Sequence, residues 1–168
     1  WMMHAANAHG DLQIDPVYKR LRNEGAERFA YDVRSRFGGE PILMEKVARN
    51  VLKNRRRFRA LVLLADQSPG GRDNVYWTEW LNQPTGFFLG PATISQLTGF
   101  PVMFARCRRK ARGRYHLSLI PIVETPGQLT EEQIIEAYIR AAEQTIREEP
   151  ESYLWSNRRW KHQPPEVT

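Results

Sequence analysis

The segment Ala60-Leu-Val-Leu-Leu-Ala65, followed at once by Asp66-Gln67, decides the fold predicted from this sequence. A continuous apolar run that ends on a charge and a Ser-Pro-Gly-Gly turn is typical of a strand buried on both faces, in the middle of a sheet. Ligands of open α/β sheets bind outside the carboxyl ends of such strands, so Asp66 and Gln67 are expected where chemistry takes place. The alternative is that the Asp66 side chain only caps the turn after it.

Helical and extended patterns alternate on both sides of this run. The alternation predicts an α/β fold in which helices cover a mixed, largely parallel sheet, with the last two strands as an antiparallel hairpin at its edge. The helix expected over residues 24–36 has its apolar residues on one face, made of Ala26, Phe29, Ala30 and Val33. Helical spacing covers residues 1–9, 24–36, 45–54, 92–97 and 130–149, and extended patterns cover 13–18, 101–106 and 115–122.

The chain is expected to form one domain. Its 168 residues suit a single hydrophobic core, 41% of them are apolar, and no repeat or linker divides them. Residues 1–163 are therefore predicted as a single α/β domain, and residues 164–168 as a disordered tail. The sequence starts on Trp1 inside a helical pattern, without an initiator Met or a cap, so the domain is expected to be truncated at its amino end.

Clustered positive charge predicts an anionic partner. The formal net charge is +6 at pH 7, and the cations gather in three places. Such clusters favour nucleic acid, anionic lipid head groups or an acidic carrier protein, and charge alone does not choose among them. A solvated surface without a partner is the alternative. The clusters are Arg55, Arg56, Arg57 and Arg59; Arg106, Arg108, Arg109, Lys110, Arg112 and Arg114; and Arg158, Arg159 and Lys161.

Several classes of site are missing from the sequence. The single Cys107 has no partner for an internal disulfide, which fits a reducing compartment. No metal-binding spacing, glycine-rich phosphate loop or Ser-centred elbow is present. No apolar stretch reaches the roughly 20 residues of a membrane-spanning helix, so membrane contact within this chain is expected to be peripheral. An aromatic segment is either core or a lipid-facing patch; it contains Trp77, Trp80, Phe87 and Phe88.

Six short motifs occur in an order that is specific, although each motif by itself is modest. Together they cover the chain from about Asp15 to His162 and strongly resemble the bacterial lipid A biosynthesis acyltransferases, the lauroyl and myristoyl transferases of the HtrB/MsbB type. The motifs are Val17-Tyr-Lys-Arg-Leu-Arg-Asn23, Arg34-Ser-Arg-Phe-Gly-Gly39, Leu64-Ala-Asp-Gln67, Pro84-Thr-Gly86 with Gly90-Pro-Ala92, Thr98-Gly-Phe-Pro-Val102, and Pro150-Glu-Ser-Tyr-Leu-Trp-Ser-Asn-Arg-Arg-Trp-Lys161.

The resemblance implies a glycerolipid acyltransferase-like fold and an enzyme at the cytoplasmic face of the bacterial inner membrane. Such an enzyme moves a fatty acyl group from acyl carrier protein to a hydroxyl of a lipid A precursor or related glycolipid. It implies no cofactor, since acyl-acyl carrier protein is a co-substrate. The expected partners are acyl carrier protein, an anionic glycolipid acceptor and the membrane surface, with no nucleic acid.

The general base of the resembled family is missing from this chain. In that family a His is followed, after four residues, by Asp or Glu. The fifth residue after His4 is His9, and the fifth after His9 is Ile14, so neither histidine fits. The chain is therefore expected to be the carboxyl-terminal portion of such an enzyme, and to be inactive by itself.

The remaining family motifs supply the predicted site residues. Negative charge develops on the carbonyl oxygen during acyl transfer, and nearby cations lower that barrier. The resemblance implies catalytic roles for Lys19 and Arg34 as cations and for Asp66 as the group that orients them or the acceptor. Lys19 stands where relatives carry Arg, so a planar bidentate grip is not expected there. The substrate-binding residues implied are Tyr18, Asn23, Gln67, Arg158, Arg159 and Lys161.

Three other functions stay open. A non-catalytic basic module would bind nucleic acid through its arginines, with binding that falls steeply as salt rises. An acyltransferase of the same kind would act on another membrane lipid, because relatives with different acceptors share these motifs. A degenerate homologue would have no activity at all.

Overall fold

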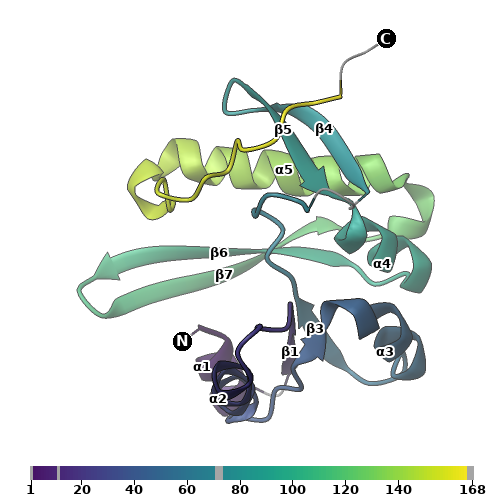
Figure 1. Ribbon diagram of the computed structural model, residues 1–168, viewed down its shortest axis with the longest axis vertical. Helices are drawn as coiled ribbons and strands as arrows, with labels where there is room; N and C mark the ends of the chain where they lie inside the picture. The colour runs from purple at the N-terminus through teal and green to yellow at the C-terminus, as the bar shows by residue number, and fades with distance from the viewer. Residues whose placement is uncertain (1, 11, 71–73, 166–168) are drawn as a thin grey trace. The chain divides into compact units, whose positions relative to one another are not determined.

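The structure, a computed structural model, describes residues 2–10, 12–70 and 74–165. The chain divides into two compact units, residues 1–64 and residues 65–168, and each unit is described by itself (Figure 1). Parallel strands, antiparallel hairpins and helices together confirm the α/β fold class. The prediction of one domain over residues 1–163 stays a prediction, and residues 166–168 of the predicted tail lie outside the described residues.

The first unit is a three-stranded parallel sheet with helices. Its strand order is β2-β1-β3, and β1 pairs with both neighbours in parallel. The predicted first strand and first three helices are confirmed within one to three residues at most ends. The elements are α1 (Met2–His9), β1 (Gln13–Tyr18), α2 (Glu24–Ser35), β2 (Ile42–Leu43), a 3₁₀ turn (Met44–Lys46), α3 (Val47–Lys53) and β3 (Arg59–Val62).

The central strand of this sheet is β1, which corrects the prediction for the apolar run 60–65. Only residues 60–62 of that run belong to a strand, the short β3, which pairs with β1 alone and lies at the edge of the sheet. No residue of β3 is buried, whereas four of the six residues of β1 are. The strand β1 was predicted, but its central position was missed because Gln13 and Asp15 interrupt its apolar pattern. A buried charge is not expected in a central strand unless a partner neutralises it.

The partner of Asp15 is Arg59, on the neighbouring strand. The carboxylate accepts from the Arg59 guanidinium at 2.9 Å, and the two side chains are 0% and 1% exposed. Asp15 also accepts from the Glu40 backbone N–H at 2.7 Å, and Arg59 donates to Asn50 Oδ1 at 2.7 Å. This network joins β1, β3, α3 and the segment after α2, so a charge becomes the centre of the unit.

Helix α2 begins where the sequence predicts it. Asn23 caps it through a bond from the Ala26 N–H to Asn23 Oδ1 at 2.9 Å, as Asn commonly does at this position. No residue of α2 is buried, and Phe29 is 72% exposed. The predicted helix is therefore confirmed, and its apolar face is largely exposed within the described residues.

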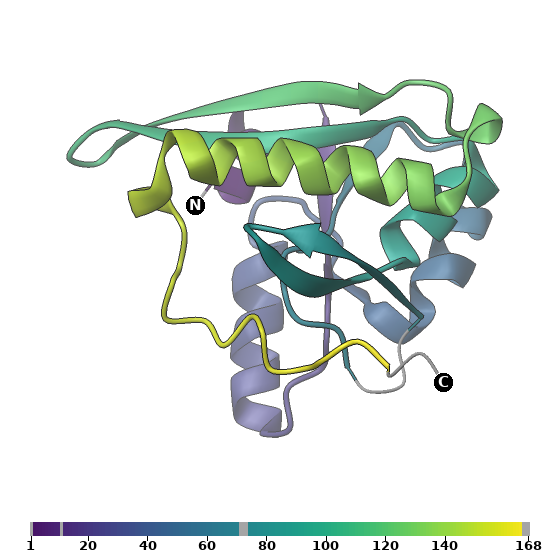
Figure 2. The ribbon, with the colours of Figure 1, turned by 90° about the horizontal axis from the view of Figure 1, so that it is seen from above.

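The second unit consists of two antiparallel hairpins and two helices. Helix α5 lies between the hairpins, as the views in Figures 1 and 2 agree. The predicted helix after the aromatic segment is confirmed and ends at Gly99 in the left-handed conformation, φ 72°. The elements are β4 (Val75–Trp80), β5 (Gln83–Phe88), α4 (Gly90–Thr98), β6 (Val102–Ala111), β7 (Arg114–Val123), α5 (Glu131–Glu148) and 3₁₀ turns at Pro126–Gln128 and Pro150–Ser152.

The aromatic segment forms β4 and β5 and supplies the core of this unit. Trp80 and Phe87 are fully buried, and their rings meet edge to face with centroids 5.5 Å apart. Ile135 and Ile139 of α5 belong to the same cluster. Of the two alternatives left open by the sequence, Trp80 and Phe87 are core, not a lipid-facing patch.

The predicted hairpin of residues 101–122 is confirmed and is longer than expected. Strands β6 and β7 pair in antiparallel register from Val102↔Val123 to Ala111↔Arg114. Among the strands that the structure describes, these two pair only with each other, so the hairpin is a separate sheet instead of the edge of the parallel sheet. Backbone pairing beyond β7 was not readable from sequence, because alternation marks a half-exposed face without naming a neighbour.

A buried carboxylate closes the turn between β4 and β5. Leu81 and Asn82 both have positive φ, 52° and 61°, which is the geometry of a tight hairpin turn. Glu143 of α5 accepts from the Leu81 N–H at 3.1 Å and from the Arg147 guanidinium at 2.7 Å, and it pairs with Arg140. The helix therefore fixes the turn through one side chain.

Glu143 is expected to make the stability of the second unit depend on pH. Burial by itself raises the pKa of Glu143, but hydrogen bonds from Arg147 and the Leu81 N–H, with the charge of Arg140, lower it overall. A carboxyl with a lowered folded pKa stabilises at pH above its unfolded pKa, about 4.3, and this stabilisation is lost as pH falls through the folded value. Glu143→Gln is expected to lower the free energy of unfolding by about 1–2 kcal/mol at pH 7.

The measurement is urea unfolding between pH 7 and pH 3, followed by tryptophan fluorescence. Glu143→Gln should flatten the acid limb of the stability profile, and Glu151→Gln, at an exposed position, should leave it unchanged. Equal acid slopes for wild type and Glu143→Gln would contradict this role.

Candidate functional site

The predicted site residues are divided between the two units. Tyr18, Lys19, Asn23 and Arg34 lie in the first unit, and Asp66, Gln67, Arg158, Arg159 and Lys161 lie in the second. Each group is therefore built from the contacts within its own unit.

In the first unit, Tyr18 and Arg34 are in direct contact. The Arg34 guanidinium lies over the Tyr18 ring, 4.6 Å from its centroid. The Tyr18 hydroxyl donates to Glu27 Oε1 at 2.8 Å, and the Leu21 N–H donates to Glu27 Oε2 at 2.9 Å. Burial and the Glu27 carboxylate raise the pKa of Tyr18. Helix α2 therefore fixes the Tyr18 ring through its hydroxyl, and the face of the ring contacts the Arg34 guanidinium.

Arg34 has an unused hydrogen-bonding group. Its Nη1 atom is buried and has no hydrogen-bond partner among the described residues. An arginine that is positioned by an aromatic ring, and whose donors are not consumed by the protein, is suited to bind an oxyanion or a phosphate oxygen.

The other predicted residues of the first unit differ in their surroundings. Lys19 follows Tyr18 directly and is exposed, so its ammonium is free to reach an anion at the carboxyl end of β1. The Asn23 carboxamide oxygen is already used to cap α2. A helix cap explains the presence of Asn23 without any substrate, so the structure gives it a definite local task.

In the second unit, Asp66 lies near two partly buried tyrosines and the buried Arg159. Its charge, after burial itself, raises the pKa values of Tyr138 and Tyr153, which places the carboxylate near both phenols and near Arg159. The expected position of Asp66 at the end of a central strand is wrong, because β3 ends at Val62 and Asp66 lies in a turn of the second unit. The next residue, Gln67, is exposed.

Arg159 is buried, unlike its predicted companions Arg158 and Lys161. It is 3% exposed, donates to the Gly86 carbonyl at 2.7 Å, and lies 4.5 Å from the centroid of Phe87. Burial lowers the pKa of its guanidinium. Its guanidinium therefore has a structural role in the fold, whereas Arg158 and Lys161 are exposed. The substrate-binding role of all three residues stays a prediction.

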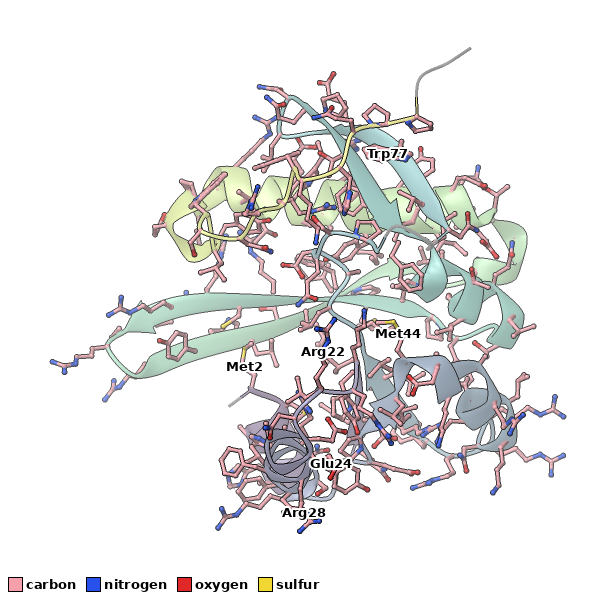
Figure 3. The ribbon with its side chains drawn as sticks, in the orientation of Figure 1. Met2, Arg22, Glu24, Arg28, Met44 and Trp77 are labelled. Atoms are coloured by element: carbon pink, nitrogen blue, oxygen red, sulfur yellow. The ribbon has the colours of Figure 1, made fainter. Side chains whose placement is uncertain are left out.

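A cavity of about 410 Å³ in the second unit was not predicted from the sequence. It lies between the β4–β5 hairpin and the carboxyl-terminal segment, where Figure 3 shows Trp77. Its walls come from segments far apart in the chain, which is why no local pattern announces it. The signal for this cavity in the sequence was the aromatic tail around Trp160. The lining residues are Ser68, Pro69, Gly70, Val75, Trp77, Pro84, Thr85, Gly86, Arg159, Trp160, His162, Gln163 and Pro165.

Within residues 2–10, 12–70 and 74–165, no group of three or more His, Cys, Asp or Glu side chains is arranged to hold a metal ion. No helix in this part of the chain combines the length and apolar character needed to cross a bilayer. Of the histidines, His4 packs against the Phe37 ring with centroids 5.3 Å apart.

Comparison with known proteins gives one result. The sequence model of one protein family, described as bacterial lipid A biosynthesis acyltransferase, matches residues 8–162. The match covers all nine predicted site residues. A search of curated proteins finds no match to this chain.

Proposed function

Because the chain belongs to the bacterial lipid A biosynthesis acyltransferase family, we propose that it takes part in moving a fatty acyl group to a lipid A precursor or a related glycolipid. The donor is acyl-acyl carrier protein, and the reaction takes place at the cytoplasmic face of the bacterial inner membrane. No cofactor is needed, because the thioester of the donor already carries an activated acyl group.

The reaction defines what each side chain has to do. The acceptor hydroxyl attacks the thioester carbonyl, a C–O bond forms, the C–S bond breaks, and the hydroxyl proton leaves to a base while the carrier thiol is released. Negative charge on the carbonyl oxygen in the transition state is stabilised by preorganised cations, each typically contributing a hundredfold or more in rate. We assign this task to Lys19 and Arg34, and we propose that Arg34 also contacts a phosphate oxygen of the bound acceptor. Asp66 is proposed to hydrogen-bond the acceptor.

The observation that carries the proposal is the state of Arg34. Its guanidinium is positioned by the Tyr18 ring at 4.6 Å, and its Nη1 is buried without a partner among the described residues. A buried donor without a partner is unfavourable unless a ligand completes it. The exposed cations Arg158 and Lys161 are proposed to attract the acceptor phosphates or the acidic carrier.

The proton acceptor is proposed to come from outside these 168 residues. The His-x4-Asp/Glu motif of the family is not present in the sequence. Incubation of the chain with radiolabelled acyl-acyl carrier protein and a lipid A precursor is therefore expected to give no transfer above background. Transfer at an ordinary enzymatic rate would contradict this part of the proposal.

Binding of the acceptor is the direct test of Arg34. A bis-phosphorylated lipid A precursor in neutral detergent micelles should bind the chain saturably, and Arg34→Gln should weaken that binding about tenfold, the value of one charge-assisted hydrogen bond. Arg36→Gln, at an exposed position at the end of the same helix, is the matched control and should bind as wild type does.

The outcomes separate the alternatives. Equal losses for Arg34→Gln and Arg36→Gln would show a non-specific charge effect and would overturn the role of Arg34. Tighter binding of a non-phosphorylated membrane glycolipid would change the acceptor. Tight binding of single-stranded nucleic acid that falls steeply with salt would favour the basic-module function instead.

A further inference from the structure

The β6–β7 hairpin carries cations of two kinds. Near α5 the arginines are neutralised, because Arg106 pairs with Glu148, and Arg108 pairs with Glu148 at 2.9 Å and with Glu149. Beyond that point the hairpin continues to a tip past the carboxyl end of α5, as Figures 1 and 2 both show. The structure therefore separates a paired inner part of the hairpin from an outer part.

The outer part has four exposed cations and no acid. Within the described residues none of the four side chains makes an ion pair or a hydrogen bond, and residues 109–116 contain no Asp or Glu. Paired arginines are explained by the fold, whereas these four contribute only mutual repulsion in the isolated protein. The four cations are Arg109, Lys110, Arg112 and Arg114.

An apolar strip runs from the tip along the face of the hairpin opposite α5. Arg109 is paired in register with Tyr115, Cys107 with Leu117, and Ala105 with Leu119, and residues in register share a face. Phe104, on the other face, packs on Tyr138 of α5. Tyr115 is 63% exposed and Leu119 is 50% exposed. The tip thus combines a cluster of four cations with the exposed Tyr115, and the apolar strip continues from it along the hairpin.

We propose that the tip of the β6–β7 hairpin binds the surface of an anionic phospholipid bilayer, with the four cations at the phosphates and Tyr115 at the interface. Charge complementarity selects this occupant, and the aromatic and apolar groups select a bilayer over a soluble acidic protein, since Tyr prefers the boundary between water and hydrocarbon. This inference rests on the proposed function in one respect: the proposed function gives the chain a reason to be at a membrane.

The test is partition of the complete 168-residue chain onto vesicles, measured by co-sedimentation. Vesicles that contain phosphatidylglycerol and phosphatidylcholine at a ratio of roughly 30:70 have an anionic surface and should bind the chain. Vesicles of pure phosphatidylcholine should not. Each cation at such a surface strengthens binding by roughly fivefold. The variant Arg109→Gln, Lys110→Gln, Arg112→Gln, Arg114→Gln should therefore bind at least about a hundredfold more weakly.

A matched control removes the same charge elsewhere. Arg49, Lys53, Arg55 and Arg56 are exposed cations on α3 and just after it, and changing all four to Gln leaves the same net charge as the tip variant. This control should keep most of the vesicle binding. Equal losses in the two variants would overturn the proposal, because net charge alone would then explain the binding.

A fluorescent label reports the contact directly. In a Cys107→Ser background, an environment-sensitive dye on Arg112→Cys should shift its emission to the blue on anionic vesicles, while the dye on Lys53→Cys should not. No shift at either position, or carrier-protein binding that is lost in the tip variant while vesicle binding persists, would overturn the proposal. The tip variant should still bind the lipid A precursor in neutral micelles, so failure here is distinguishable from failure of the proposed function.

Discussion

Asp15→Asn is expected to lower the free energy of unfolding of the first unit by about 3–5 kcal/mol, the usual effect of removing one partner of a buried ion pair. Asp15 and Arg59 are 0% and 1% exposed, and their charges meet at 2.9 Å. Without the carboxylate, the Arg59 guanidinium stays buried with its charge uncompensated, and the sheet loses the link between its central strand and β3.

The control is an exposed pair of an arginine and a carboxylate in the same unit. Arg57 and Glu40 meet at 3.1 Å but are 47% and 44% exposed, so Arg57→Gln is expected to change stability by less than about 1 kcal/mol. The combination of Asp15→Asn with Arg59→Met should recover part of the loss, because it removes the unpaired charge.

Urea unfolding gives the total effect, and amide hydrogen exchange shows where it arises. Protection should fall first in β1 and β3 of the Asp15→Asn protein. If this variant is no less stable than Arg57→Gln, the buried pair does not have the central place assigned to it.

Arg159→Leu is expected to lower the free energy of unfolding of the second unit by roughly 2–4 kcal/mol. The change leaves the Gly86 carbonyl without its donor at 2.7 Å and removes a cation from the faces of Phe87 and Trp80, at 4.5 and 5.6 Å. Arg159→Lys should not restore the wild-type stability, because a point charge cannot stack on a ring and reach a carbonyl as a planar fork does.

The neighbouring residue provides the control. Arg158 has the same side chain and is exposed, so Arg158→Leu should change stability by about 0.5 kcal/mol or less. Binding of the lipid A precursor should show the opposite pattern. It should fall for Arg158→Leu and stay at the wild-type level for Arg159→Leu, measured without denaturant, where Arg159→Leu is still folded. A stable Arg159→Leu protein that no longer binds the precursor would return Arg159 to the substrate-binding role predicted from sequence.

The family resemblance and most secondary structure were readable from the sequence because their signals are local or ordered along the chain. Thr130 and Gln133 form the capping box that starts α5, and Gly99 ends α4 with a positive φ. The resemblance is confirmed by the family match over residues 8–162. The roles of the site residues depend on ligands and stay predictions.

The misplaced elements share a physical cause. The run 60–65 was assigned to the middle of the sheet because apolar sequence and central position usually coincide, but β1 holds that place with a charge in it. The compensating Arg59 is 44 residues away from Asp15, and no window of local sequence contains both. Arg159 and Gly86 are 73 residues apart, so local sequence also hides the contact that buries Arg159.

The sequence by itself determined the fold class, the approximate positions of the helices, the antiparallel hairpin predicted over residues 101–122 and the family. Caps, alternation and motif order lie in neighbouring residues, which is why they are readable there. Only the tertiary structure decided which charges are buried and which remain free. That division between Asp15, Arg59 and Arg159 on one side and the tip cations on the other depends on partners brought together from distant positions, since a charge is buried only where the fold supplies its complement.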